Sequence, residues 1–441
     1  MSHPSIQREV ESNRTFMQDV NASTPSSALT APRTYTMLIL LMIINGINLV
    51  DRNMFGLLLP EIKREVLLSD AELGLLGGPA FALTYALSGI PIAMVADRFS
   101  RRNLIAAGVT FWSAAIAATG KATDALGLFG ARMVLGIGQA SNMAPSSSLI
   151  ADLFPNRSRT IAVSVYTSGG PLGIMLGFPF IGWMAQAHGW RAAFLAMGLL
   201  GFAVALLLLL IGREPLRAHH QQARQTGNTV PFVASLTLLA RSTPFVLLVM
   251  AGVCLSVTNT VMNVWAPTFL TRVHHLNLRE TGDLLGLYRG FLGVFAAILG
   301  GVLVSRLTHR DPRWVAWAPA ILCLLMVPAE LLFLWSDSGA GWQAGLIADT
   351  ILMSAATPCT FALLLLIVDS RIRAFGAAVY LLIFSLVGQS IGSVAVGLLN
   401  DWLAPEFREG AIRISMTLSP WAIGMTGILL FILSRKLAPA D

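Results

Sequence analysis

The stretch Asn48-Leu49-Val50-Asp51-Arg52-Asn53 places two opposite charges inside an otherwise apolar segment that runs over residues 37–59. An ionised Asp or Arg near the middle of a bilayer costs about 2.5–3.5 kcal/mol on insertion scales, so such residues face a protein interior or a wet cavity. The stretch therefore predicts a membrane-spanning helix with a functional interior. It makes Asp51 and Arg52 the first candidate site residues.

The composition supports a membrane protein. The chain has 441 residues, of which 55% are apolar and 12% are charged, against about 25% charged in soluble domains. The net charge of +7 comes from basic residues in short loops between apolar segments. We therefore interpret it as a sign of membrane topology and expect no nucleic-acid partner. Cys254, Cys323 and Cys359 lie in apolar segments without paired spacing. We expect no disulfide framework, no metal site and no cofactor.

Twelve apolar segments approach the length of about 20 residues that a membrane-spanning helix needs. They predict an all-α membrane protein with twelve transmembrane helices. The segments cover residues 35–60, 72–96, 103–122, 125–150, 160–187, 191–212, 243–270, 282–305, 313–335, 342–368, 374–400 and 412–434.

A polar stretch over residues 213–241 separates two sets of six segments. We interpret it as a cytoplasmic linker between an N-terminal six-helix bundle at 35–212 and a C-terminal six-helix bundle at 242–435. Residues 1–34 are rich in Ser, Thr and Pro and have no early apolar core, so we expect a flexible cytoplasmic tail rather than a signal peptide. Residues 436–441 form a second short cytoplasmic tail.

Lys and Arg are concentrated in alternate loops, which is the pattern of cytoplasmic loops in membrane proteins. The loop after the second segment shows it well, with Arg98, Arg101 and Arg102 within five positions. We therefore expect both termini to face the cytoplasm, with the protein in the plasma (inner) membrane.

The glycine pattern of the fifth segment recurs in the eleventh with the same spacing. Two six-helix halves in the same orientation are parallel repeats, and transporters built this way bind substrate between the halves near the middle of the membrane. We therefore predict two pseudo-symmetric six-helix bundles with a site between them. The repeated glycines are Gly173, Gly177 and Gly182 in the first half and Gly388, Gly392 and Gly397 in the second.

The chain resembles the major facilitator superfamily in three motifs, taken in order and with their spacing. This resemblance implies the major facilitator fold and a transport function. The motifs are Asp97-Arg98 with Arg101-Arg102 after the second segment, Arg132 with Gly136-Ile137-Gly138 in the fourth, and Gly189-Trp190-Arg191 before the sixth.

Within the superfamily, the chain is most similar to the spinster branch. The resemblance rests on Asp51-Arg52 followed by Leu59-Pro60-Glu61-Ile62, then Ser69-Asp70 and Gly74-Leu75-Leu76. It implies lipid-like amphiphiles as substrates, notably phosphorylated sphingoid bases and lysolipids, and proton-driven transport in bacterial members.

One departure from the spinster pattern affects the proton chemistry. Spinster-like sequences usually carry Glu seven residues after the Arg of the fourth segment, and this chain has Gln139 there. Gln matches a protonated Glu in shape but does not titrate. Either this member has lost one proton site or Gln139 mimics the protonated state.

The first and fourth segments bring two charges to similar depth. At about 1.5 Å of rise per residue, Asp51 and Arg132 both fall in the outer half of the membrane. The superfamily resemblance implies that these two helices line the cavity, so we predict that both residues share a water-accessible cavity. The stripe on one side of the first helix consists of Asn45, Asn48, Asp51, Arg52 and Phe55.

We expect a competition at this site. An unprotonated Asp51 accepts hydrogen bonds from Arg132 or Arg52, and protonation or an anionic head group breaks that pairing. Arginine suits a phosphate because its planar fork donates two hydrogen bonds. The open alternative is that Asp51 and Arg52 only pair with neighbouring helices and support packing.

The second half offers further cavity candidates. Asn259 and Asn263 are four residues apart and share a helix face, with interhelical hydrogen bonding as an equal alternative. Arg289 and Asp349 lie at similar depth and are expected to pair or to line the cavity. Glu330 falls near a membrane surface, so no role is predicted for it. The remaining wall is expected to be apolar, with Phe55, Met143, Met262 and Trp265.

The loop after the second segment predicts a cytoplasmic gate. The family resemblance places Asp97 at the start of the eleventh helix, where a carboxylate gains about 0.3–1 kcal/mol from the helix dipole. Arg101 or Arg102 is expected to meet Asp152, and Arg98 completes the basic cluster.

These features predict a secondary active transporter that works by alternating access and is proton-coupled. The expected cargo is an amphipathic anionic or zwitterionic lipid of lysolipid or sphingoid-phosphate type. Efflux of small organic anions or drugs is the alternative within the class, and a membrane-embedded lipid enzyme or a non-transporting sensor is the alternative outside it. We expect protons and membrane lipids as partners and a monomeric protein.

Overall fold

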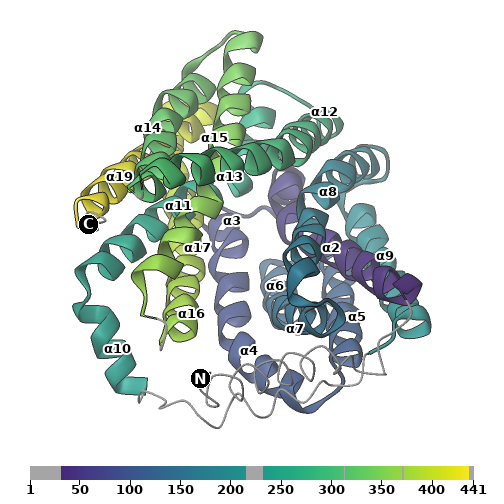
Figure 1. The fold of residues 1–441 in the computed structure, drawn as a ribbon. Helices are drawn as coiled ribbons and strands as arrows, with labels where there is room; N and C mark the ends of the chain where they lie inside the picture. Colours follow the sequence, from purple (N-terminus) through teal and green to yellow (C-terminus); the bar gives the residue numbers. More distant parts are fainter. Residues whose placement is uncertain (1–30, 215–231, 312, 370–371, 437–441) are drawn as a thin grey trace, which may run out of the picture.

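A computed structural model describes residues 31–214, 232–311, 313–369 and 372–436 (Figure 1). Most of the predicted tail at 1–34, the linker residues 215–231 and almost all of the predicted tail at 436–441 lie outside the described residues. The described part is almost entirely helical and holds no strand. The all-α membrane fold is therefore confirmed, while the domain boundaries stay a prediction.

The N-terminal half makes six crossings with eight helices, because two crossings are interrupted. Gly78 and Pro79 separate α3 from α4, and a turn at residues 140–142 separates α6 from α7. The helices are α2 (Ala31–Val66), α3 (Asp70–Gly77), α4 (Pro79–Arg98), α5 (Arg101–Thr119), α6 (Ala125–Gln139), α7 (Met143–Leu153), α8 (Asn156–His188) and α9 (Trp190–Ile211).

The C-terminal half follows a short helix, α10 (Phe232–Arg241), that lies inside the predicted linker. Two crossings contain π-helical turns, η2 and η3, which are often found at functional sites. The elements are α11 (Thr243–Val273), α12 (Leu278–Leu285), η2 (Gly286–Leu292), α13 (Gly293–Arg310), α14 (Trp314–Trp335), α15 (Gly339–Ile367), α16 (Arg373–Ile383), η3 (Phe384–Gly388), α17 (Gln389–Phe407), η4 (Arg408–Gly410), α18 (Ala411–Ser415) and α19 (Leu418–Ser434).

Nine stretches of the described residues are long and apolar enough to cross a membrane. One of them, residues 375–434, contains two of the predicted crossings. The other two crossings are α5, which begins with Arg101 and Arg102, and the interrupted pair α6 and α7. The structure is thus consistent with twelve crossings.

The two halves pack closely at the end where α2 and α11 finish. A side chain at Gly56 of α2 would lie 2.7 Å from the Asn263 carbonyl of α11, and one at Gly282 of α12 would lie 2.5 Å from the Phe178 carbonyl of α8. Small residues let helix backbones approach in this way. The same contacts frame the cavity described next.

Candidate functional site

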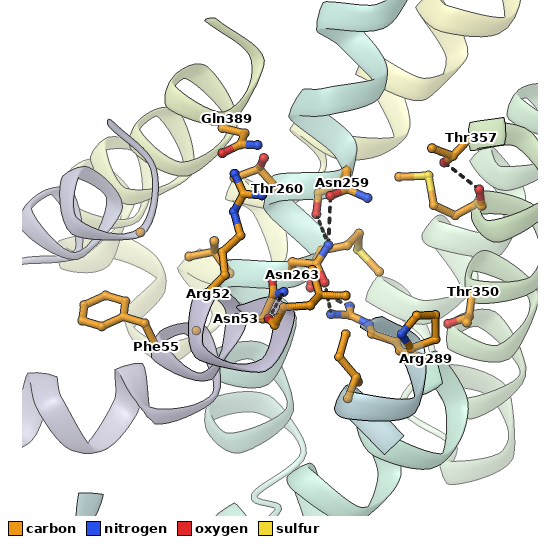
Figure 2. A pocket seen from close by; sticks show the side chains of 18 of the residues that line it. Arg52, Asn53, Phe55, Asn259, Thr260, Asn263, Arg289, Thr350, Thr357 and Gln389 are labelled. Atoms are coloured by element: carbon orange, nitrogen blue, oxygen red, sulfur yellow. Dashed lines mark hydrogen bonds between the residues drawn. The ribbon is translucent and has the colours of Figure 1, made fainter. Parts of the chain in front are cut away.

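A cavity of about 420 Å³ lies between the two halves (Figure 2). Residues of α2, α4, α6 and α8 face residues of α11, η2, α15 and α17 across it. It therefore lies where the parallel repeats predict a site. Its apolar lining consists of Leu49, Phe55, Phe81, Pro171, Ile174, Met262, Val264 and Met353.

Two arginines of the N-terminal half line this cavity, and their guanidinium groups lie against aromatic rings. The guanidinium of Arg132 lies 4.6 Å from the ring centre of Phe55, and that of Arg52 lies 4.4 Å from Phe81 and 5.0 Å from Tyr85. Arg132 also donates to the Leu76 carbonyl at 3.1 Å. One terminal nitrogen of Arg52 has no hydrogen-bond partner among the described residues. The aromatic faces thus hold the two guanidinium groups and leave donor capacity for a ligand.

Asp51 does not join these arginines. It is fully buried and is not among the residues that line the cavity. Within the described part of the chain, its carboxylate has neither an ion pair nor a hydrogen-bond partner, and the indole of Trp112 lies within reach. The side chains of consecutive residues in a helix point about 100° apart. The rotation of α2 about its axis therefore directs Arg52 to the cavity and Asp51 to α5.

The remaining polar residues of the α2 stripe also lie behind the cavity wall. Asn45 donates to the Tyr166 carbonyl of α8 at 3.2 Å, and Gln139 donates to the Asn48 carbonyl at 3.1 Å. One polar atom each of Gln139 and Asn48 is buried without a partner in the described structure. The predicted stripe is therefore divided, with Arg52 and Phe55 on the cavity and the other three residues against α5, α6 and α8.

The C-terminal half contributes a third arginine. Arg289 lies in the π-helical turn η2 and donates to Asn263 Oδ1 at 3.0 Å and to the Met262 carbonyl at 2.6 Å. Asn263 in turn donates to the Asn259 carbonyl at 2.7 Å. These residues and Asp349 line the cavity, but no ion pair joins Arg289 to Asp349 among the described side chains.

Two of the four residues predicted for the apolar wall line the cavity. Phe55 and Met262 line the cavity, whereas Trp265 is fully buried and donates to the Ser393 carbonyl. Met143 is 57% exposed and does not line the cavity. Side-chain direction, rather than depth, separates these residues.

Several polar lining residues, among them Thr260 and Gln389, were not among the sequence candidates. Figure 2 shows the guanidinium of Arg52 pointing toward Thr260 of α11 and Gln389 of α17. Gln389 directly follows Gly388 of the repeated glycine pattern, which is the one signal in the sequence that leads to it.

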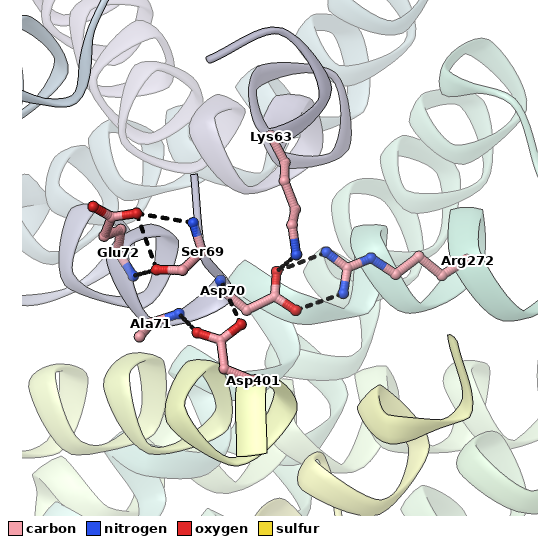
Figure 3. A network of polar contacts seen from close by, with 7 residues as sticks. All are labelled: Lys63, Ser69, Asp70, Ala71, Glu72, Arg272 and Asp401. Carbon is pink, nitrogen blue, oxygen red and sulfur yellow. Dashed lines mark hydrogen bonds and ion pairs between the residues drawn. The ribbon is translucent and has the colours of Figure 1, made fainter. Parts of the chain in front are cut away.

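A network of charges joins the halves at the closely packed end (Figure 3). Asp70 of α3 accepts two hydrogen bonds from Arg272, at 2.7 and 2.8 Å, and one from Lys63 at 2.7 Å. Asp401 of α17 accepts from the backbone N–H groups of Asp70 and Ala71 at the start of α3, where a carboxylate is favoured by the helix dipole. The network ties α3 of one half to α11 and α17 of the other.

The predicted gate residues form a different network, inside the N-terminal half. Arg101 pairs with Asp152 at 2.6 Å and with Glu214 at 3.2 Å, and Arg102 donates to the Gly212 carbonyl. These contacts link α5, α7 and the end of α9 rather than the two halves. Arg98 is exposed, and the side chain of Asp97 lies outside the described part of the structure.

Glu214 is the acid at the centre of this network. Burial alone would raise its pKa, but hydrogen bonds from Ser100 and from the backbone and side chain of Arg101 outweigh that effect and hold the pKa below the usual range for Glu. The carboxylate is therefore the form that the network stabilises.

Comparison with known proteins places this architecture in a family. Residues 41–393 match the Major Facilitator Superfamily. The chain is 29% identical to an MFS-type efflux pump of Mycolicibacterium smegmatis over 398 residues, which cover 89% of this chain and 90% of the relative. It is 25% identical to the sphingosine-1-phosphate transporter SPNS2 of Danio rerio over 392 residues, which cover 83% and 76%.

A solved structure supports the same placement. The crystal structure of a bacterial homolog of the human lysosomal transporter spinster, in an inward-facing and unoccupied conformation, superposes with a TM-score of 0.75 at 26% identity. The match covers 92% of this chain and 96% of that one. The chain is therefore an integral membrane transporter rather than an enzyme; it belongs to the major facilitator superfamily, within the spinster branch.

Proposed function

We propose that this transporter moves an amphipathic anionic or zwitterionic lipid, of lysolipid or sphingoid-phosphate type, by proton-coupled alternating access. The observation that carries the proposal is the charge of the cavity. Arg52, Arg132 and Arg289 line it, with Asp349 as the one acid among the described lining residues.

This lining suits a charged head group with an apolar tail. Guanidinium groups donate paired hydrogen bonds to phosphate or carboxylate oxygens, and the π-helical turn η2 places Arg289 in the lining of the same cavity as Arg52 and Arg132. The apolar lining residues, including Phe55, Ile174 and Met353, suit an acyl chain better than a sugar, which needs many polar partners.

The proton role is assigned to Asp51. A buried carboxylate without a cation, and with only the indole of Trp112 within reach as a donor, is costly, so the protonated group is favoured at such a position. We propose that Asp51 binds a proton in this state and loses it when the helices rearrange and an arginine approaches. Gln139 of α6 does not titrate and contacts Asn48 of α2. Asp51 is therefore the carboxylic acid that we assign to proton binding here.

The conformational state follows from the contacts between halves. Asp70, Arg272 and Asp401 join the halves at the end away from the predicted cytoplasmic termini. With both termini in the cytoplasm of a plasma (inner) membrane, this end is extracellular. We therefore assign the structure to an inward-facing state of a monomeric transporter, as in the solved spinster homolog.

Efflux of small organic anions or drugs is the second candidate function. It is favoured by the 29% identity to an MFS-type efflux pump, and the same three arginines would bind a small anion. The apolar lining residues distinguish the two cargoes, because a short anion has no acyl chain to contact them.

Counterflow in proteoliposomes tests the proposal. Vesicles loaded with a lysophospholipid or with a short organic anion are exposed to the labelled compound at two pH values. We expect faster exchange of the lysophospholipid. Equal or faster exchange of the short anion would favour the efflux function, and exchange of neither would refute both.

A further inference from the structure

A second buried acidic site lies in the C-terminal half. Glu330 of α14 is fully buried and Asp349 of α15 is 4% exposed, and their carboxyl groups lie within hydrogen-bonding reach of each other. As the sequence indicates, Glu330 lies near the end of α14 (Trp314–Trp335), but α15 and α19 pack against α14 and the side chain is buried, which the sequence did not show. The mechanism proposed above uses neither carboxyl group for proton transfer.

Oxygens of both carboxyl groups lack a hydrogen-bond donor among the described residues. Both oxygens of Glu330 and one of Asp349 are buried without a hydrogen-bond partner in the described part of the chain. Ionised carboxylates only accept hydrogen bonds, and two of them in contact repel each other. A single proton removes the repulsion and supplies the missing donor, so the pair titrates as one unit.

A hydroxyl group points to the same position. Ser419 of α19 is fully buried, its oxygen has no partner among the described atoms, and it lies within reach of Glu330. The hydroxyl group of Ser419 and the carboxyl group of Glu330 thus come from different helices and lie close together at one buried position.

Asp349 gives this site access to the cavity. Asp349 lines the cavity and Glu330 does not. We propose that Glu330 and Asp349 form a proton-binding site of the C-terminal half, which exchanges its proton with the transport cavity through Asp349. Its use in transport rests on the proton coupling proposed above, whereas its occupation by a proton does not.

Three polar groups of the described residues interact with the pair, and they come from η2, α14 and α19. Arg289 of η2 acts electrostatically on Asp349, and Cys323 of α14, a neutral thiol at neutral pH, lies near Glu330. On α19 the group is Ser419, whose carbonyl accepts from Thr258 of α11. Arg289 is therefore the cation that controls the site.

Arg289 links the proton to the substrate. Its hydrogen bonds now go to Asn263 and the Met262 carbonyl rather than to Asp349. An anionic head group at Arg289 neutralises that cation and favours a proton on the acid pair. Release of the anion lets Arg289 favour the ionised pair, so anion and proton bind with positive coupling.

Infrared difference spectroscopy of the full-length protein in nanodiscs tests the site. The parent protein for this test carries Asp51→Asn, because a protonated Asp51 would give a C=O band of its own. In a pH titration of this parent we expect a C=O band of a protonated buried carboxyl group that Glu330→Gln and Asp349→Asn each abolish. The matched control Asp283→Asn, at an exposed acid of α12, should keep the band. A band that survives both Glu330→Gln and Asp349→Asn, or no such band in the parent protein, would overturn the proposal.

Four further measurements make the result unambiguous. Arg289→Gln should move the loss of the band to higher pH, and an unchanged titration would contradict the control by Arg289. Replacement of choline by Na⁺ should leave the band unchanged, whereas its loss in Na⁺ would identify a cation site instead. A size-exclusion profile and a melting temperature like those of the parent show that Glu330→Gln is folded. Because the parent carries Asp51→Asn, a failure of the Asp51 assignment is seen in transport assays and not in this spectrum.

Discussion

The two halves of this transporter are built on the same repeat but treat their buried acids differently. In the N-terminal half, Asp51 is sealed behind the cavity wall while Arg52 and Arg132 rest on aromatic rings and face the cavity. In the C-terminal half, Asp349 itself faces the cavity beside Arg289. The acid is therefore separated from the arginines in the N-terminal half, whereas acid and arginine both line the cavity in the C-terminal half. This difference suits the two halves to different steps of the transport cycle.

The largest effect is expected from removal of the sealed acid. Asp51→Asn should abolish accumulation driven by a proton gradient while counterflow persists, because an amide keeps the shape of the protonated acid but does not release a proton. Proteoliposome uptake with and without a pH gradient measures this, with Asp283→Asn as the control. Intact gradient-driven uptake in Asp51→Asn would refute the assignment.

The next largest effect concerns the contact between the halves. Asp70→Asn leaves Arg272 and Lys63 without their carboxylate, and breaking a buried ion pair costs about 3–5 kcal/mol. We expect the outward-facing state to gain population. Labelling of single cysteines in the cavity from the extracellular side reports this, and Glu61→Gln, at a more exposed ion pair, is the matched control.

Unchanged labelling in Asp70→Asn would show that the network of Asp70, Arg272 and Asp401 does not hold the halves together. Increased labelling in both variants would point to a general loosening of the fold instead of a specific latch.

A smaller effect is expected at the arginines that face the cavity. Arg132→Gln and Arg289→Gln should each weaken binding of a lysophospholipid by about 2 kcal/mol or more, which is roughly 30-fold. The concentration for half-maximal counterflow measures the loss. Arg279→Gln, at a largely exposed arginine of α12, should bind normally, and equal losses in all three variants would remove the head-group argument.

The sequence was sufficient for the fold because apolar runs of spanning length translate directly into helices. It was insufficient for the direction of side chains. Hydropathy gives the depth of Asp51 and Arg52 but not the rotation of α2, which is set by packing against its neighbours. For the same reason the burial of Glu330 was not predicted, since it depends on the packing of α15 and α19.

Contacts between distant segments were equally out of reach. Asp70 binds Arg272, 202 positions away, and its backbone is capped by Asp401, 331 positions away. No local pattern around Ser69-Asp70 predicts these partners. By contrast, the pairing of Arg101 with Asp152 follows from motif and topology, because both lie at the same end of neighbouring helices.

The smallest effect is expected in the network within the N-terminal half. Glu214→Gln should lower thermal stability modestly at neutral pH. The pKa of Glu214 is held below its unfolded value, so its stabilising contribution is present above the unfolded pKa and is lost as the pH falls through the folded pKa. Melting curves should therefore converge for parent and variant at acidic pH, and a constant difference at all pH values would contradict this.

The central claim is that an anionic head group binds between the halves on the arginines of both. A cryo-electron microscopy structure with a bound lysophospholipid tests it most directly. We predict the phosphate in contact with Arg132 or Arg289 and the acyl chain along Phe55 and Ile174. A head group bound outside this cavity, or a cavity that stays empty at saturating lipid, would contradict the account.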